Sequence, residues 1–411
     1  MSVVGQIDHP HSANVAQKPS PAEEPCAPIS RETAVELIQP RSLPLPDLLV
    51  AAQAVRAHHK PPVITYSRKV FIPLTNLCRD YCGYCTFRRD PGEPGAHTMT
   101  PEEVMLVVRE GERAGCTEAL LSLGDKPELI FPQMRETLRQ LGYKSTLHYL
   151  EAMCEKILCE STLLPHPNPG LMSEEWLRRL ARVSPSMGLM LETTSKRLLG
   201  PNAAHDNAPD KEPAKRLRVI EDAGRQKIPF TTGILIGIGE TLEERVDSLI
   251  AIRDLHVRYG HIQEVIVQNF RAKPITPMAN WPEPDREDML RTVAVSRLLM
   301  PGMNIQAPPN LSDPHYADLL DAGINDWGGI SPLTPDFINP EKPWPHLAEL
   351  QRRTEGKGFE LRQRLPVYPE FVPQAARQSE LLAQSISRTT SRSALQGLRI
   401  AHDPVTAGGT A

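Results

Sequence analysis

Residues 69–85 read KVFIPLTNLCRDYCGYC, an apolar run that passes directly into a loop carrying three cysteines. The run over 69–75 is typical of a buried strand, because it is short, apolar and rich in strand-forming residues. Cys78, Cys82 and Cys85 follow it, separated by three and then by two residues. If the strand belongs to a β/α barrel, this loop lies at the C-terminal mouth, where active sites of that fold are built.

Downstream of this stretch, short β-branched runs alternate with helical patterns, as in repeated β-α units. Helical patterns with clear N-terminal caps begin at Thr100 and Thr241. About eight strands over roughly 260 residues predict a (β/α)8 barrel of the TIM type, closed or partly splayed. An open doubly wound sheet is the alternative, since periodicity does not separate the two. The other expected strands are 118–124, 162–166, 187–193, 230–237, 264–270, 304–309 and 324–330.

Composition around the barrel predicts extensions at both ends of the 411-residue chain. Two amphipathic helices precede the first strand, one capped by Ser30 and one entered through Pro46. Both termini are polar and lack periodicity, so we expect them to be disordered. The expected segments are a disordered tail (1–28), a helical extension (29–64), the barrel (65–345), a C-terminal extension packed on the barrel (346–380) and a second disordered tail (381–411).

Charge and cysteine content exclude several classes of function. The 46 basic and 50 acidic side chains give a net charge of -4 without a concentrated basic stretch, so no nucleic-acid partner is expected. There is no apolar run of the roughly 18 residues that a membrane span needs, and no signal-peptide core. We therefore expect a cytoplasmic protein without a membrane partner. Seven cysteines, an odd number, argue against a disulfide framework.

The three clustered cysteines have the composition of an open metal centre. A closed structural zinc site needs four ligands, usually as two separate pairs, and no second CxxC or HxxxH pair is present. An iron–sulfur cubane held by three thiolates leaves one iron open to a further ligand. We therefore favour a reactive iron–sulfur centre, with a zinc-stabilised scaffold as the non-enzymatic alternative.

The stretch LTNLCRDYCGYCTFRRDP, residues 74–91, resembles the signature loop of the radical S-adenosylmethionine (radical SAM) superfamily. It has the CxxxCxΦC pattern, with Tyr84 as the aromatic residue. The resemblance implies that Cys78, Cys82 and Cys85 hold a [4Fe-4S] cluster whose fourth iron binds the methionine part of S-adenosylmethionine. It also implies radical chemistry, because the cluster cleaves this cofactor to an adenosyl radical that takes hydrogen from substrate.

Two further motifs extend the resemblance to the S-adenosylmethionine site. SLGDKPE (122–128) resembles the position that receives the methionine ammonium, which would assign that role to Gly124, Asp125 and Glu128. Taken alone, the same residues form an ordinary turn. GILIGIGET (233–241) resembles the segment along the adenine, which would place Gly233 and Gly237 there. Its spacing does not match a dinucleotide-binding loop.

Glu192 ends the fourth predicted strand and is a candidate for the adenosyl ribose hydroxyls, since a buried carboxylate needs donors. Alternatively it pairs with Lys196 or Arg197 on the following turn. Glu192 and Asp326 are the two carboxylates that we expect to take part in catalysis. Asp326 would handle a proton, although an Asp before a Gly-Gly turn also caps backbone.

Several segments resemble one branch more closely, the first subunit of the family that makes the deazaflavin FO of coenzyme F420. The resemblance covers roughly residues 45–373 and departs from the pattern at Lys126, Pro167 and Ile275. It implies oxidation and closure of an adduct of tyrosine's hydroxybenzyl group with a ribitylaminouracil, with loss of ammonia. The segments are FIPLTNLCRDYCGYCTFRRDP, LSLGDKPE, LLPHPNPG, TTGILIGIGET, VQNFRAKP, IQAPPNL, DWGGISPLTPDFINPEKPWP and RLPVYPEF.

The same resemblance implies two protein partners, a second FO synthase subunit that supplies the adduct and an electron donor of the flavodoxin or ferredoxin type. A sister radical SAM enzyme acting on another aromatic adduct is the alternative. Polar residues at predicted strand ends suit a uracil, a ribityl chain and a phenol, although each also suits a hydrogen bond at a barrel rim. These substrate candidates are His166, Asn168, Thr231, Thr232, Gln268, Asn269, Arg271, Lys273, Gln306, Asn310 and Trp327.

Overall fold

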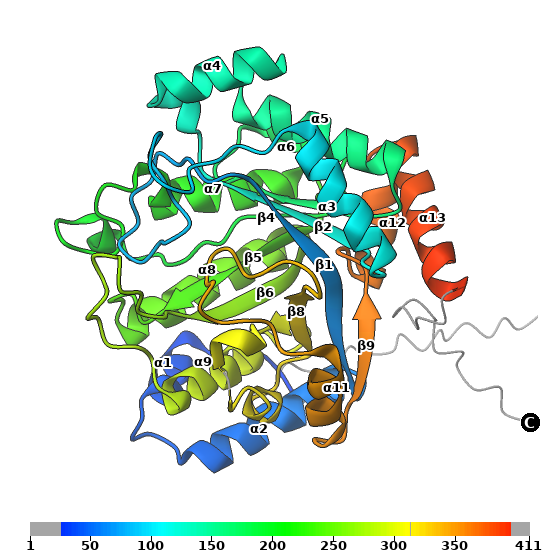
Figure 1. Ribbon diagram of the computed structural model, residues 1–411. Coiled ribbons are helices and arrows are strands. Elements are labelled where there is room, and N and C mark those ends of the chain that lie inside the picture. The colour runs from blue at the N-terminus through cyan, green and yellow to red at the C-terminus, as the bar shows by residue number, and fades with distance from the viewer. Residues whose placement is uncertain (1–25, 313, 396–411) are drawn as a thin grey trace, which may run out of the picture.

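A parallel barrel of eight strands forms the centre of the computed structural model, which describes residues 26–312 and 314–395 (Figure 1). The strands follow the order β3-β2-β1-β8-β7-β6-β5-β4. Because β1 pairs with both β2 and β8, the barrel prediction is confirmed and the doubly wound alternative is wrong. The strands are β1 (Val63–Thr75), β2 (Glu118–Leu123), β3 (Leu164–Asn168), β4 (Met187–Gly188), β5 (Phe230–Ile236), β6 (Ile262–Asn269), β7 (Ile305–Gln306) and β8 (Asp326–Ile330).

The barrel is not closed by backbone pairing on every side. Within the described residues, β3 and β4 stand at the two ends of the strand order and do not pair with each other. A side-chain hydrogen bond spans this seam, between His166 Nδ1 and Ser186 Oγ at 2.8 Å. β4 spans only Met187 and Gly188, although the backbone N–H groups of Leu189 and Glu192 still donate to carbonyls of β5.

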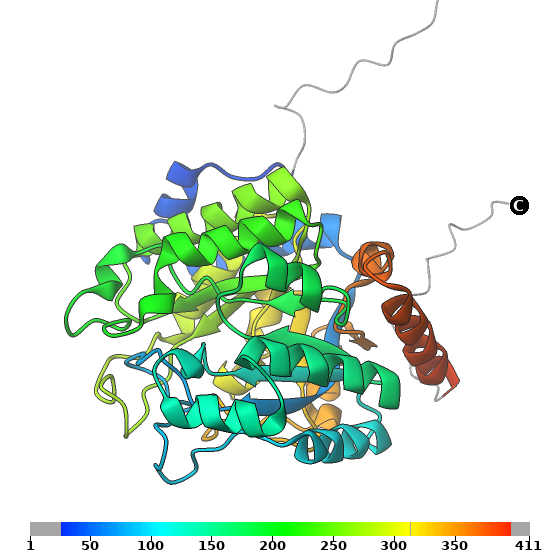
Figure 2. The same cartoon turned by 90° about the horizontal axis from the view of Figure 1, so that it is seen from above.

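Helices pack around the outside of the barrel and follow the strands as the sequence predicts (Figures 1 and 2). Thr100 and Thr241 each form a capping box with the glutamate three residues later, which fixes where two of these helices begin. No helix in the described ranges combines the length and apolar composition needed to cross a membrane. The surrounding helices are α3 (Pro101–Arg113), α4 (Pro132–Leu141), α5 (Thr146–Glu160), α6 (Glu174–Leu180), α7 (Pro213–Arg225), α8 (Leu242–Tyr259), α9 (Arg286–Leu299) and α10 (Asp318–Asp321).

Two N-terminal helices, α1 (Arg31–Ile38) and α2 (Leu45–His59), pack on the outer helices. Ser30 caps α1 by accepting from the Thr33 backbone N–H, and Pro46 lies in the first turn of α2. Arg31 pairs with Asp247 of α8 at 2.6 Å, so the extension is tied to the barrel by specific contacts.

The C-terminal part departs from expectation. β9 (Glu360–Arg364) pairs in parallel with the first half of β1, an element that the proline-rich sequence did not indicate. α13 (Glu380–Leu395) follows α11 (Leu347–Glu355) and α12 (Val372–Ala376). The expectation of disorder from residue 381 is therefore wrong for 381–395, where Leu382 and Ile386 are buried. The remainder of both expected tails, 1–25 and 396–411, lies outside the described residues.

Candidate active site

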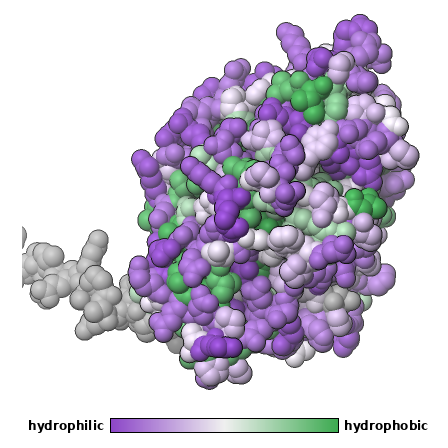
Figure 3. Space-filling view, turned by 90° about the vertical axis from the view of Figure 1, so that its left-hand side faces the viewer, coloured by the Kyte–Doolittle hydropathy of each residue, from purple (hydrophilic) through white to green (hydrophobic). Residues whose placement is uncertain are grey.

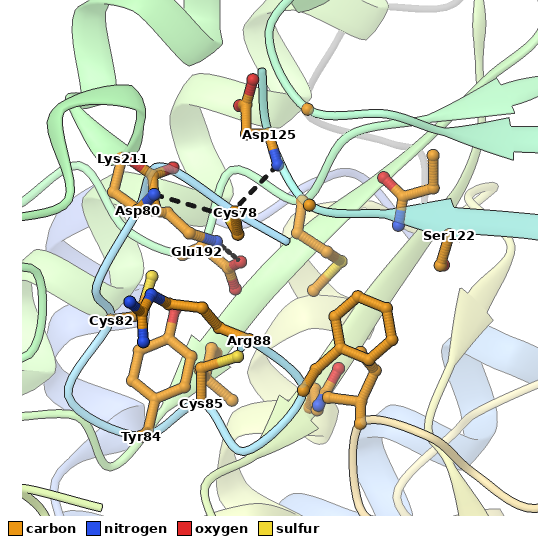
Figure 4. Close-up of a pocket in the computed structure, with 18 of the residues that line it drawn as sticks. Cys78, Asp80, Cys82, Tyr84, Cys85, Arg88, Ser122, Asp125, Glu192 and Lys211 are labelled. Carbon is orange, nitrogen blue, oxygen red and sulfur yellow. Dashed lines mark hydrogen bonds and ion pairs between the residues drawn. The ribbon is translucent and has the colours of Figure 1, made fainter. Parts of the chain in front are cut away.

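A cavity of about 230 Å³ lies at the C-terminal ends of the strands (Figure 4). The loops that surround this mouth lie on the side of the molecule that faces the viewer in Figure 3. The surface on that side is largely hydrophilic, with scattered apolar residues. All three clustered cysteines line this cavity. Its other polar lining residues include Asp80, Tyr84, Arg88, Ser122, Asp125, Asn168, Glu192, Lys211, Arg216, Gln268, Asn269, Arg271, Lys273 and Asn339.

The first cysteine is fixed by the turn that follows β2. Cys78 Sγ accepts hydrogen bonds from the backbone N–H groups of Asp80 at 3.4 Å and Asp125 at 3.2 Å (Figure 4). Gly124 permits this approach, because a Cβ there would lie 1.9 Å from the carbonyl oxygen of Leu77. Burial raises the pKa of Cys78 to about 12. The thiol of Cys78 is therefore neutral near pH 7 without a metal, and metal binding would require it to lose its proton.

The opposite side of the cysteine loop is held by the segment 202–211. The backbone N–H of Gly83 donates to the Ala204 carbonyl at 2.8 Å, and the N–H of Asp210 donates to Asp80 Oδ1 at 3.0 Å. Tyr84, the aromatic residue of the motif, lines the cavity with its hydroxyl 3.1 Å from His205 Nε2. The loop is thus fixed by contacts from a segment more than 100 residues away in sequence.

The donor set fits an open iron–sulfur centre better than a closed zinc site. In the described part of the chain, all seven cysteines are free thiols, and only Cys78, Cys82 and Cys85 line the cavity. No histidine lines it to complete a tetrahedral zinc site of the usual kind. Three sulfurs from one loop around an open volume match a cubane with one iron left for another ligand.

Three carboxylates lie beside the loop and are compensated by cations. The carboxylates of Asp80, Asp125 and Asp210 lie within 4.8 Å of one another. Lys126 Nζ pairs with Asp125 at 2.7 Å and with Asp210 at 3.1 Å, and Arg79 Nε lies 3.3 Å from Asp210. Burial raises the pKa of Asp125 to about 6. Lys126 thus clamps the base of the loop, so its departure from the family pattern keeps a cation there.

Glu192 lies in the cavity as expected and faces a cation that the sequence did not indicate. Its carboxylate pairs with Lys211 Nζ at 2.5 Å (Figure 4). Burial favours the neutral acid, but Lys211 and Arg216 outweigh it, so the pKa of Glu192 lies below its usual value. The alternative pairing with the following turn is wrong, because Arg197 instead pairs with Glu244 at 2.8 Å. Its φ of 65° is unusual for a non-glycine residue and marks a constrained position.

Two groups of residues expected near the cofactor do not reach this cavity. Glu128 caps α5 instead, accepting from the backbone N–H and the hydroxyl of Thr146 at 3.1 and 2.5 Å. Gly233 and Gly237 are also absent from its lining. The backbone N–H of Gly237 donates to the carboxylate of Glu240 at 2.8 Å, so a carboxylate of the chain itself occupies this loop. A phosphate-binding function for the loop is therefore excluded.

The expected substrate residues divide between two connected cavities. Asn168, Gln268, Asn269, Arg271 and Lys273 line the outer cavity described above. A second cavity of about 120 Å³ lies deeper in the barrel and is lined by His166, Asn168, Thr231 and Gln306 among others. Asn168 and Met190 line both, so the inner cavity continues the outer one toward the N-terminal ends of the strands.

Two of the outer-cavity cations are already paired at the rim. Arg271 bonds the Leu311 carbonyl through Nε at 2.7 Å and pairs with Glu283 at 2.6 Å. Lys273 Nζ donates to the Ile338 carbonyl at 2.7 Å. Both side chains therefore tie the loop after β6 to its neighbours.

Four candidates lie outside both linings. Asp326 is fully buried and receives two hydrogen bonds from Arg364, at 2.6 and 3.0 Å. Trp327 is also fully buried and donates to Thr354 Oγ1 at 3.0 Å on the outside of the barrel. These placements argue against the catalytic role expected for Asp326 and the substrate role expected for Trp327. Thr232 is buried in β5, and Asn310 donates to Asp336 Oδ2 at 3.0 Å and to the Lys342 carbonyl at 3.0 Å.

Some site residues were missed by sequence reasoning. Lys211 and Arg216 belong to a segment between β4 and β5 without a recognisable motif, so only the fold brings them to the cavity. Asp80 and Arg88 lie inside or just after the cysteine motif, where proximity to Cys78 could have drawn attention to them. Lys69 and Glu118 were read only as parts of strands, because lumen-facing charges are not distinguishable from rim charges by sequence.

Comparisons with known protein sequences found a matching family model, and relatives that match most of the chain. The radical SAM superfamily model matches residues 72–252. The chain is 51% identical to the 7,8-didemethyl-8-hydroxy-5-deazariboflavin synthase of Methanopyrus kandleri over 310 residues, 75% of this chain and 93% of that protein. It is 53% identical to the FO synthase of Streptomyces avermitilis over 350 residues, which are 82% of this chain but only 41% of that protein.

Solved structures share the fold at lower identity. Methylornithine synthase superposes with a TM-score of 0.64 at 20% identity, over 82% of this chain and 94% of that one. The FeFe-hydrogenase maturase HydG from Carboxydothermus hydrogenoformans gives 0.65 at 20% identity, over 90% and 87%. At this identity the likeness extends to the barrel alone.

Proposed function

The chain belongs to the FO synthase family of the radical SAM superfamily, and from this premise we propose that it completes the synthesis of the deazaflavin FO. Its substrate would be the adduct of tyrosine's hydroxybenzyl group with a ribitylaminouracil, which it would oxidise and close to the tricyclic product with release of ammonia. The observation that carries the proposal is the 51% identity over 93% of the Methanopyrus kandleri synthase.

Cys78, Cys82 and Cys85 would hold a [4Fe-4S] cluster, and Asp125, Glu192 and Lys211 are placed to bind S-adenosylmethionine beside it. The donor set supports this assignment, because three thiols and groups of both charges line one cavity. When bound, the two cofactors supply one-electron chemistry that no side chain can perform. Glu192 could accept hydrogen bonds from ribose hydroxyls, and Lys211 could receive a carboxylate.

The protein's own contribution is enclosure and orientation. The cavity narrows from the loops at the mouth to the inner part of the barrel, so a substrate seated there is surrounded by strands and separated from bulk water. Asn168 lies where the two cavities meet and can hydrogen-bond a substrate that spans both. The cysteine loop is held from both sides, which would fix the cofactors relative to that substrate.

The lengths of the relatives support a partner subunit. The chain spans 93% of the Methanopyrus synthase but 41% of the Streptomyces protein named FO synthase. We therefore propose that a second radical SAM subunit supplies the adduct to this chain. A flavodoxin or ferredoxin would supply the electron.

Anaerobic turnover tests the proposal. Reconstituted protein with S-adenosylmethionine, a reductant and the tyrosine–uracil adduct should give blue-fluorescent FO, 5'-deoxyadenosine, methionine and ammonium. Cleavage of S-adenosylmethionine without FO from this adduct would point to a sister enzyme with another substrate. Protein that binds about one zinc and no iron or sulfide after anaerobic reconstitution would support the scaffold alternative instead.

A further inference from the structure

The inner cavity contains charged groups that the cysteine site does not use. Lys69 of β1 and Glu118 of β2 face each other in register across neighbouring strands, and both line this cavity. Glu264 and Arg364 lie at its floor, where they pair with each other at 3.0 Å. The two charges at the floor therefore neutralise each other, whereas Lys69 has no ion-pair partner among the described residues.

Lys69 is a buried cation without a hydrogen-bonding partner. Lys69 is 7% exposed. Its ammonium nitrogen lies 4.9 Å from the ring centroid of Trp344 and 5.6 Å from that of Phe71. Within the described residues it has neither a hydrogen-bond acceptor nor an ion-pair partner. Glu118 instead accepts from Ser67. A buried ammonium with three unused donors is costly, and two ring contacts compensate only part of that cost.

Three further polar side chains present unpaired atoms to the same space. Gln306 of β7 and Asn168 of β3 line the inner cavity, and their side-chain amides have no hydrogen-bond partner among the described residues. His166 uses Nδ1 for Ser186, which leaves Nε2 unpaired. Gly188 keeps that nitrogen accessible, because a Cβ there would lie 3.2 Å from it. Burial lowers the pKa of His166 to about 4, so the ring is neutral near pH 7.

These groups come from strands on different sides of the barrel and converge on one volume. A phenol offers a single hydroxyl and needs one or two partners, whereas a pyrimidinedione offers two carbonyl acceptors with an N–H between them. An ammonium and two amides match the second pattern. The outer cavity, by contrast, includes Phe87, Leu123, Leu235 and Phe270, which suit an aromatic ring.

We propose that the inner cavity binds the pyrimidinedione ring of the substrate, with Lys69 donating to a ring carbonyl oxygen and Gln306 pairing with the ring edge. The proposal rests on the proposed function and adds an orientation to it. The uracil end points toward the floor of the barrel, and the hydroxybenzyl end points outward to the cysteine site. Asn168, at the junction of the cavities, lies between the two ends.

Calorimetry on the anaerobically reconstituted protein tests this assignment with two fragments of the substrate. One probe is 5-amino-6-(D-ribitylamino)uracil, which lacks the phenol, and the other is 4-hydroxybenzyl alcohol, which lacks the uracil. K69M should lower the affinity for the uracil probe by about tenfold or more, because a hydrogen bond from a charged group contributes that much binding free energy. It should leave the phenol probe unchanged, and K69R should retain part of the uracil affinity.

K60M is the matched control, because Lys60 is a partly buried lysine that donates to Asn304 at 2.6 Å and lines neither cavity. It should bind both probes as the wild type does. Q306L tests the site independently if K69M fails to fold, and it should also weaken the uracil probe selectively. Cluster absorbance and circular dichroism establish that each variant is intact.

The outcomes separate the inference from the function on which it rests. Wild-type protein that forms FO, together with K69M and Q306L variants that bind the uracil probe as tightly as the wild type, overturns the inference alone. Selective loss of the phenol probe in K69M would also overturn it, by reversing the orientation. Wild-type protein that forms no FO from the adduct overturns the proposed function, whatever the probes show.

Discussion

The backbone N–H of Asp125 donates a hydrogen bond to Cys78 Sγ over 3.2 Å, so the turn after β2 holds the first cysteine of the loop after β1. The two segments can meet because Gly124 has no side chain to separate them. The position of the sulfur is thus set by a neighbouring strand as well as by its own loop.

Gly124→Ala should displace the cysteine loop. The added Cβ would lie 1.9 Å from the Leu77 carbonyl oxygen and 2.7 Å from Cys78 Cβ, so backbone must move. We expect iron and sulfide content after reconstitution to fall severalfold. Gly302→Ala is the control, since nothing lies within 4 Å of a Cβ at that position. Equal iron content in both variants would contradict the close-approach argument.

Cys82→Ala should abolish cluster assembly and leave the barrel folded, because the loop lies at the mouth rather than in the core. Far-ultraviolet circular dichroism should match the wild type, while the brown colour and S-adenosylmethionine cleavage are lost. Cys159→Ala removes an exposed thiol outside the cavity and should retain both. A brown, active Cys82 variant would show that this cysteine is not a ligand.

Asp326→Asn should act mainly on stability. The substitution leaves Arg364 buried with one carboxylate partner fewer, and breaking a buried ion pair costs about 3–5 kcal/mol. Chemical denaturation would measure the loss in the free energy of unfolding. A variant that keeps full stability but forms no FO would instead restore the catalytic role predicted from sequence.

Buried histidines should make the free energy of unfolding fall as the pH is lowered. Burial lowers the pKa of His261 from 6.5 to about 4, so below about 6.5 the unfolded chain binds the proton more readily. The loss grows as the pH falls from 6.5 toward 4 and reaches about 3 kcal/mol at most. His261→Gln should show a shallower decline over this window in urea titrations of cluster-free protein. If the free energy of unfolding of the variant fell as steeply with pH as that of the wild type, the lowered pKa of His261 would be contradicted.

Glu192→Gln should weaken S-adenosylmethionine binding, because it removes the anion that faces Lys211 and the proposed ribose acceptor. We expect a loss of about tenfold by equilibrium dialysis with reconstituted protein. Glu243→Gln, an exposed substitution at the start of α8, is the control. Unchanged affinity in the Glu192 variant would place the ribose elsewhere.

Sequence reasoning was accurate where chemistry or periodicity is local. The cysteine motif lies within eight residues, and alternation of strand and helix patterns is visible in short windows, so the barrel and the placement of Cys78, Cys82 and Cys85 beside one cavity could be predicted. β9 was missed because prolines and charges hide a strand whose partner, the first half of β1, lies about 300 residues away. α13 was missed because its polar residues mask two buried apolar positions.

Site residues were predictable only in part, for a geometric reason. Asp326 and Trp327 are neighbours at the start of β8, yet one binds Arg364 inside the sheet and the other packs outward against Thr354. Sequence position at a strand end gives no direction, since successive side chains point to opposite faces. Glu128 likewise matched a motif, but the N-terminus of α5 takes its carboxylate.

The sequence by itself determined the spacing of three thiols on one loop and the alternation that builds a barrel, because residue type, spacing and hydrophobic period are properties of adjacent residues. Only the tertiary structure decided which distant groups meet: Lys211 with Glu192, Arg364 with Asp326, and Lys69 with two aromatic rings but no hydrogen-bonding or ion-pair partner among the described residues. Burial makes these pairings energetically decisive, and burial depends on how strands far apart in the chain close around one lumen.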